Sequence, residues 1–290
     1  MTFMAVRSTA VLLINCPDAK GIVASVSGFL YQHGANILST DEHRDDASCQ
    51  YLMRIEWDLA GFGLSEDAFA AQFQQRVAAA FGMGWRVEYS HRPPRMALFV
   101  SRYLHCLADL LHRHHTGELP GGIALIVSNH LDAKPLADFY GVPFELVEVT
   151  RDNKSEAEQR QIALMLEHNV DLIVLARYMQ VLSPDFVDRY RGRIINVHHS
   201  FLPAFSGAKP YHAAFERGVK LIGATSHYVT EVLDDGPIIE QEVIRVSHRD
   251  QLSDLIEKGR DAERIVLSHA VRWHLEHRIL QYGNKTVVFS

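Results

Sequence analysis

The stretch "INVHHSFLP", residues 195–203, places an amide and an imidazole, Asn196 and His198, two positions apart at the end of an apolar run. If this run is a strand, residues two apart point to the same face, so both side chains project together. An amide donor beside a titratable imidazole suits the stabilisation of negative charge that develops on a carbonyl oxygen. We therefore treat both as candidate catalytic residues, although a strand-end cap explains either residue alone equally well.

A carboxylate is the third group that such a site needs, and "HYVTEVLDDGPII" offers Asp234 and Asp235 just before Gly236. A carboxylate near an imidazole favours the imidazolium and orients the ring. Amide, imidazole and carboxylate together suit attack of a nucleophile on a carbonyl carbon. Aspartates are also common in turns for backbone reasons alone, so residue type does not establish a catalytic role for either aspartate.

Two other kinds of site are not expected from the sequence. Ser200 follows the histidine pair, but no GxSxG elbow surrounds it, which argues against a serine nucleophile. The tract "HRHH" at 112–115 has no cysteine or carboxylate set at metal-ligand spacing. We therefore predict that the protein uses no metal.

Composition limits the remaining possibilities. The chain has 290 residues, of which 47% are hydrophobic and 22% charged, which is typical of a globular protein of about two domains. The net charge of -6, without a lysine or arginine cluster, indicates neither a nucleic-acid partner nor a membrane partner. Cys16, Cys49 and Cys106 are odd in number and far apart, as reduced thiols would be, and no signal peptide or long apolar run is present. We expect a cytoplasmic protein.

The Pro93-Pro94 pair in "SHRPPRM" reads as a short stiff linker, because proline donates no hydrogen bond to a strand ladder. We predict one domain over residues 1–90, a linker over 91–95 and a second domain over 96–290. The first half shows four strand patterns, "TAVLLINC", "ANILSTDEH", "CQYLMRIEW" and "WRVEY", with helices after Gly21 and after Ser65. The order βαββαβ predicts a ferredoxin-like unit whose sheet has one open face and can pair edge to edge or face to face with a copy of itself.

The second half is predicted to be α/β. Its short apolar runs, "RMALFVS", "GIALIVSN", "PFELVEV", "VDLIVLARY" and "GRIINVHH", alternate with helical segments, as in a Rossmann-like, mostly parallel sheet covered on both faces. Ligands bind such sheets at the carboxyl ends of the strands. Asn129, the loop "ARYMQVLSP", Asn196 and His198 all fall at such ends.

Two resemblances add to these expectations. The stretch "NCPDAKGIVASVSGFLYQHGANI" resembles the opening of an ACT domain, a regulatory module that often binds amino acids at a dimer interface. Two interpretations stay open: an amino-acid effector contacting Gly21 and Asn36, or a module for assembly alone. Either way we expect a homo-oligomer, a dimer or a tetramer.

"INVHHSFLPAF", followed by "GATSHYVTEVLDDGPIIEQE", resembles the folate-dependent formyltransferase fold, and residues 8–290 are similar to the formyltetrahydrofolate deformylase family. The resemblance implies hydrolysis of 10-formyltetrahydrofolate to tetrahydrofolate and formate, which supplies formate to purine synthesis and balances the one-carbon folate pools. It implies no cofactor, because the folate is the substrate. The family's catalytic residues fall on Asn196, His198 and Asp234, the last being the aspartate seven residues beyond His227. Its folate pocket falls on Met179, Gln180, Val181, Leu182, Val229, Thr230 and Glu231.

Two alternatives remain: a formyl transferase with an amine acceptor such as glycinamide ribonucleotide, and a non-catalytic amino-acid sensor that binds folate. In this fold a phosphorylated acceptor needs a glycine-rich turn after the first strand. No glycine occurs from Met96 to His115, and Tyr103 and Leu104 add bulk there, although Arg102 offers a point charge. The sequence therefore favours water as the formyl acceptor.

Overall fold

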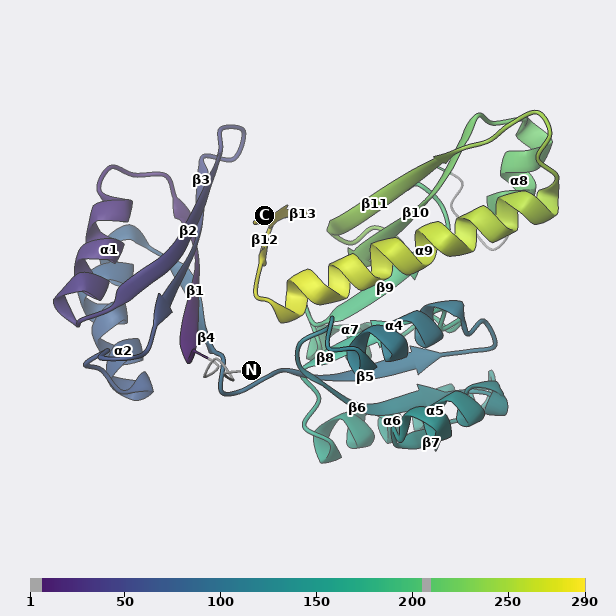
Figure 1. Ribbon diagram of the computed structural model, residues 1–290, viewed down its shortest axis with the longest axis horizontal. Coiled ribbons are helices and arrows are strands. Elements are labelled where there is room, and N and C mark those ends of the chain that lie inside the picture. The colour runs from purple at the N-terminus through teal and green to yellow at the C-terminus, as the bar shows by residue number, and fades with distance from the viewer. Residues whose placement is uncertain (1–6, 205–209, 290) are drawn as a thin grey trace, which may run out of the picture. The chain divides into compact units, whose positions relative to one another are not determined.

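The computed structural model describes residues 7–204 and 210–289, which form two compact units (Figure 1). The first unit contains the chain up to Pro93 together with His277–Tyr282 and the residues from Val287 onwards. The second contains Pro94–Glu276 and Gly283–Thr286. The division between Pro93 and Pro94 lies inside the expected linker. The assignment of His277–Tyr282 to the first unit differs from the expected extent of the second domain.

The first unit has the predicted order βαββαβ. Its strands are β1 (Thr9–Pro17), β2 (Asn36–Asp45), β3 (Gln50–Asp58) and β4 (Gly84–Tyr89), and its main helices are α1 (Ile22–Gln32) and α2 (Glu66–Phe73). A π-helical turn η1 (Gln74–Ala78) and the short α3 (Ala79–Phe81) prolong α2. The strands form an antiparallel sheet in the order β2-β3-β1-β4. The ferredoxin-like prediction, consistent with an ACT-like domain, is therefore confirmed.

One face of this sheet carries both helices, as Figure 1 shows. Side chains alternate between the two faces in β3, so Tyr51, Met53, Ile55 and Trp57 all enter the core beneath α1 and α2. The helix α2 begins where predicted, because the Ser65 side chain accepts a hydrogen bond from the Ala68 N–H (3.3 Å).

The opposite face of the sheet was expected to be open, and this expectation is wrong for its centre. The C-terminal strands β12 (Ile279–Tyr282) and β13 (Lys285–Val288) form a two-stranded sheet of their own. Leu280 of β12 and Phe289, just after β13, pack on Leu13 and Leu52 of that face, and all four side chains are buried. Burial of this apolar surface explains why the end of the chain clusters with the first unit. Self-association stays a prediction, but an open face of this sheet no longer supports it.

The second unit contains a seven-stranded sheet in the order β11-β10-β9-β8-β5-β6-β7. Five neighbouring strands run parallel, which confirms the mostly parallel sheet: β5 (Arg95–Val100), β6 (Gly122–Ser128), β7 (Phe144–Leu146), β8 (Leu172–Leu175) and β9 (Ile194–His198). The antiparallel strands β10 (Leu221–Tyr228) and β11 (Ile238–Arg245) complete it.

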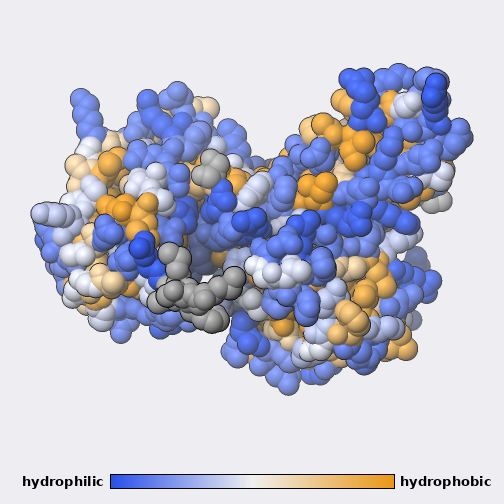
Figure 2. Space-filling model, in the orientation of Figure 1, coloured by the Kyte–Doolittle hydropathy of each residue, from blue (hydrophilic) through white to orange (hydrophobic). Residues whose placement is uncertain are grey.

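The helices of this unit are α4 (His105–His115), α5 (Lys134–Tyr140), α6 (Lys154–Glu167), α7 (Pro184–Arg189), α8 (Pro210–Arg217) and α9 (Leu252–Leu275), with a 3-10 turn η2 (Leu131–Ala133). Tyr103 lies in the turn before α4. Among the described residues no helix is long and apolar enough to cross a membrane. Figure 2 shows a mainly hydrophilic surface on the face in view, with hydrophobic residues in separate patches.

Candidate active site

Antiparallel pairing of β9 and β10 brings the central polar residues together. Asn196 lies opposite His227, and His198 lies opposite Thr225. Residues directly opposite each other in an antiparallel pair share a face of the sheet, so Asn196, His198 and His227 project to the same side. The pairing of β10 with β11 shifts register between Ser226 and His227, an irregularity that often lies beside active sites.

His227 fixes the orientation of the Asn196 amide. The Nδ1 of His227 lies 2.9 Å from the Tyr228 carbonyl oxygen, which can only accept, so Nδ1 carries the proton. Burial lowers the pKa of His227 below its ordinary value of 6.5, so the ring is neutral and its Nε2 is an acceptor. Asn196 Nδ2 donates to this Nε2 over 3.2 Å. The second N–H of the amide is thereby left for a ligand.

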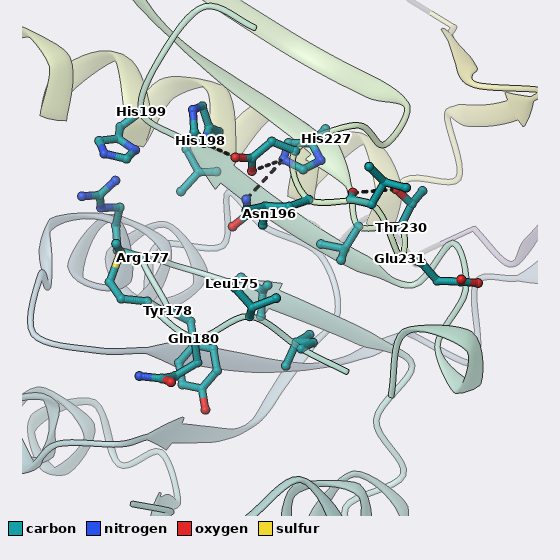
Figure 3. A pocket seen from close by; sticks show the side chains of 18 residues that line it. Leu175, Arg177, Tyr178, Gln180, Asn196, His198, His199, His227, Thr230 and Glu231 are labelled. Atoms are coloured by element: carbon teal, nitrogen blue, oxygen red, sulfur yellow. Dashed lines mark hydrogen bonds and ion pairs between the residues drawn. The ribbon is translucent and has the colours of Figure 1, made fainter. Parts of the chain in front are cut away.

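His198 is paired with Asp234, and a dashed line drawn from His198 in Figure 3 marks this ion pair. The Nδ1 of His198 lies 3.2 Å from Asp234 Oδ2, and their side chains are only 6% and 14% exposed. The hydrogen bond from His198 lowers the pKa of Asp234 below its ordinary value of 3.8, against the opposing effect of burial. The Nε2 of His198 is buried and has no hydrogen-bond partner among the described residues, so this nitrogen remains for a substrate or water.

The turn between β10 and β11 holds Asp234 in place. Asp234 has a left-handed backbone (φ 57°), which few residues other than glycine, asparagine and aspartate adopt. Gly236 lies against the strand end, where a Cβ would come within 1.7 Å of the Tyr228 carbonyl oxygen. Asp235 is exposed, and its carbonyl oxygen accepts a hydrogen bond from Asn284 Nδ2 (2.9 Å). Only Asp234 of the two aspartates reaches His198.

The loop after β8 forms the facing wall of the site. The Met179 N–H donates to Ser101 Oγ (3.0 Å), and the Ser183 N–H donates to Glu158 Oε1 (2.9 Å). Ser101 Oγ in turn donates to Asn129 Oδ1 (2.7 Å), which gives Asn129 a supporting position outside the cavity. Because both ends of the loop are fixed, the backbone between them, Gln180 to Leu182, is held in place for a ligand.

A cavity of about 290 Å³ lies between these two walls. It is lined by all ten residues that the sequence assigned to catalysis or folate binding: Asn196, His198, Asp234, Met179, Gln180, Val181, Leu182, Val229, Thr230 and Glu231. Met179 and Val181 are 47% and 57% exposed although they are apolar, so their side chains form an apolar edge on which a flat ligand can pack.

Several residues that line the cavity had no predicted role. His227 is one of them. The sequence offers a signal for it, because Thr225 and His227 are polar residues two apart in the otherwise mostly apolar strand β10. Arg177 lines the cavity, and its partner Glu263 is buried in α9. Ser200, rejected as a nucleophile, donates its hydroxyl to the Ala204 carbonyl oxygen (2.7 Å).

The fold and the site define a class of enzyme that handles formyl groups. A family model described as formyl transferase matches residues 94–271. A solved structure of glycinamide ribonucleotide transformylase 1 from Symbiobacterium toebii has a TM-score of 0.64 and 29% identity, and covers 68% of this chain and 95% of that one. The similarity to that transformylase is thus confined to about two thirds of the chain.

Other relatives match the whole chain. A formyltetrahydrofolate deformylase from Synechocystis sp. is 52% identical over 97% of this chain and 99% of its own length. The crystal structure of a formyltetrahydrofolate deformylase from Pseudomonas syringae has a TM-score of 0.96 and 46% identity, and covers 99% of this chain and 96% of that one. The chain belongs to the formyltetrahydrofolate deformylase family, as its motifs indicated.

Proposed function

We propose that the chain hydrolyses 10-formyltetrahydrofolate to tetrahydrofolate and formate, with Asn196, His198 and Asp234 as the catalytic residues. The observation that carries the proposal is the joint placement of these three polar side chains in one cavity, beside a wall of partly exposed apolar side chains. The N10-formyl group is an amide-like carbonyl, so water needs help both to attack the carbon and to expel the amine.

The oxyanion is the first group that the site serves. As water adds to the formyl carbon, negative charge develops on the carbonyl oxygen. The free N–H of Asn196, held by His227, and the unpartnered Nε2 of His198 are the donors for this oxygen. Because neighbouring side chains fix both groups before the reaction, little reorganisation is needed in the transition state.

The proton balance involves Asp234 and His198. Asp234 orients the imidazole through Nδ1 and, as a carboxylate, positions the attacking water. The water's oxygen forms the new bond to carbon, the bond from carbon to N10 breaks, and a proton passes to N10 from His198 or through a water. One proton of the attacking water replaces the proton given to N10, and the other passes to solvent when formic acid ionises to formate. The products are tetrahydrofolate and formate.

The pterin ring would occupy the slot between Met179–Leu182 and Val229–Glu231. A pterin is flat and carries mixed hydrogen-bond donors and acceptors, which suits a slot with apolar side chains and exposed backbone groups. The backbone N–H groups of Gln180, Val181 and Leu182 make no hydrogen bond to another described residue, which supports this assignment.

Product analysis with 10-formyltetrahydrofolate as the sole substrate tests the proposal. We expect equal amounts of formate and tetrahydrofolate without any amine present, at a rate that glycinamide ribonucleotide does not raise. If tetrahydrofolate forms only when that acceptor is added, and formate is absent, the chain is a transferase. Folate binding without turnover would instead make it a folate-binding sensor.

A further inference from the structure

Arg177 has an unusual backbone for its residue type. It lies in the left-handed region (φ 64°), where glycine is favoured and a long side chain adds strain. Such strain is kept where surrounding contacts require it, and it often marks a functional position. Arg177 follows β8 and lines the cavity. Glycine would fit this backbone without strain, so we look for the role of residue 177 in its side chain.

Two contacts hold the guanidinium of Arg177. Its Cζ lies 5.2 Å from the centre of the Tyr103 ring, and its Nε lies 3.4 Å from Glu263 Oε2. Glu263 is 1% exposed and also accepts hydrogen bonds from His105 Nε2 and Tyr211 Oη, both 2.8 Å long. Arg177 therefore lies between the Tyr103 ring and the Glu263 carboxylate, and His105 and Tyr211 hold that carboxylate in place.

Gly259 permits this arrangement. It precedes Glu263 by one turn of α9, and a Cβ there would come within 2.2 Å of the Tyr211 ring. Burial acts to raise the pKa of Glu263, but the hydrogen bond from His105 and the charge of Arg177 outweigh it, so the pKa is lowered. Glu263 is thus a buried carboxylate for which the proposed hydrolysis has no use.

Ligand atoms of His105, Cys106 and Glu263 lie within 4.8 Å of one another, a spacing that a metal ion could bridge. Arg177 and Tyr211 already contact the carboxylate of Glu263, however, and the cationic guanidinium would repel a metal ion. The network is better explained as the support of Arg177.

Arg177 and His199 lie on one side of the catalytic residues in Figure 3, whereas Thr230 and Glu231 lie on the other. In the proposed function the folate occupies the side of Thr230 and Glu231. A second reactant has to reach the formyl carbon from the remaining side. We propose that Arg177, held by Tyr103 and Glu263, closes that side to amines and so makes water the only acceptor. This inference rests on the proposed function.

Hydroxylamine is a suitable probe, because it is a small, strong nucleophile without a phosphate. In the transfer reaction its nitrogen bonds to the formyl carbon, the bond from carbon to N10 breaks, and a proton from hydroxylamine ends on N10. The products are N-hydroxyformamide and tetrahydrofolate. The ratio of N-hydroxyformamide to formate, corrected for the enzyme-free reaction, reports acceptor choice independently of the overall rate.

The decisive variant is Arg177→Gly, which removes the side chain and suits the left-handed backbone. We expect the wild-type chain to give enzymatic N-hydroxyformamide at or below the detection limit, and Arg177→Gly to raise the ratio to at least ~10-fold above that limit. The double variant Arg177→Gly/Glu263→Gln removes both charges together and replaces the single variant if that one does not fold. We expect the double variant to show the same rise in the ratio. Arg177→Lys keeps length and charge and should stay near the wild-type ratio.

Gln180→Gly is the matched control, because it shortens a polar side chain of the same loop, in the segment assigned to the folate slot. It should change KM without changing the ratio. A ratio that stays at the wild-type value in every folded Arg177→Gly variant overturns the inference while leaving hydrolysis intact. Absence of formate from the wild-type chain would instead remove the proposed function, and this inference with it.

Discussion

His198 and Asp234 are joined by a 3.2 Å contact between imidazole Nδ1 and carboxylate Oδ2, although one belongs to β9 and the other to the turn after β10. The contact depends on three local features: antiparallel pairing of β9 with β10, the left-handed backbone of Asp234 and the close approach of Gly236 to Tyr228. Because the ring is oriented through Nδ1, its Nε2 is left for chemistry.

Asp234→Asn should lower kcat by about 10²-fold or more, because it removes the carboxylate that orients His198 and positions water. Asp235→Asn should have a mild effect, since Asp235 is exposed. Steady-state formate release by the two variants, assayed side by side, measures the difference. The opposite order of severity would move the catalytic role to Asp235.

Asn196→Ala should lower turnover by roughly 10²- to 10³-fold, the usual loss for one oxyanion donor. His198→Ala should lose at least about 10²-fold. The proposed roles are chemical, so the unfolding midpoint in urea should change little in either variant. Turnover within about threefold of wild type in both would show that these residues are not catalytic.

His227→Ala should act through Asn196, as expected of a positioning residue. Without the acceptor Nε2, the amide of Asn196 can rotate, so kcat should fall by about 10-fold or more while KM for the folate stays near the wild-type value. Double-mutant cycles with Asn196→Ala test this, because two residues that act together are not additive. Additive losses in kcat would contradict the role.

Patterns with a short period were predictable from the sequence. Residues two apart in β9 share a face, which correctly placed Asn196 beside His198. The choice of Asp234 over Asp235 came from the family resemblance, because a turn aspartate has no pattern that tells which way it points.

Features that depend on distant partners could not be predicted. The bond between Asn196 and His227 requires the register of β9 on β10, which sequence periodicity does not contain. The burial of Leu13 and Leu52 by Leu280 and Phe289 joins opposite ends of the chain. Arg177 has a left-handed backbone that residue preferences would assign to glycine. Backbone preference therefore fails as a predictor at the residue to which we assign acceptor specificity.

His277 should make the protein less stable in acid. Burial, together with the charges of Arg86 and Arg54, lowers its pKa from 6.5 to about 4. Between these values the unfolded chain binds a proton that the folded chain does not, so stability is complete above about pH 6.5 and falls as pH falls towards 4. At 1.36 kcal/mol per pKa unit the loss is of order 3 kcal/mol.

His277→Asn tests this dependence, because asparagine tolerates the left-handed backbone of residue 277 (φ 53°). Urea unfolding at pH 7 and pH 4.5 should show a smaller acid loss in His277→Asn than in wild type. His43→Asn, at an exposed position in β2, is the control and should keep the wild-type loss. An unchanged pH dependence in His277→Asn would assign the acid sensitivity to other groups.

Gly236→Ala should separate the geometry of the turn from the chemistry of its side chains. A Cβ at residue 236 would come within 1.7 Å of the Tyr228 carbonyl oxygen and 3.3 Å of His227 Nδ1, so the turn must move away from β10. We expect Asp234 to leave His198, kcat to fall by about 10-fold or more, and stability to fall by about 1–3 kcal/mol. Gly28→Ala is the control, because a Cβ there meets nothing within 4 Å and alanine favours the helix α1. Wild-type kcat in Gly236→Ala would show that the reaction does not need the contact between Asp234 and His198.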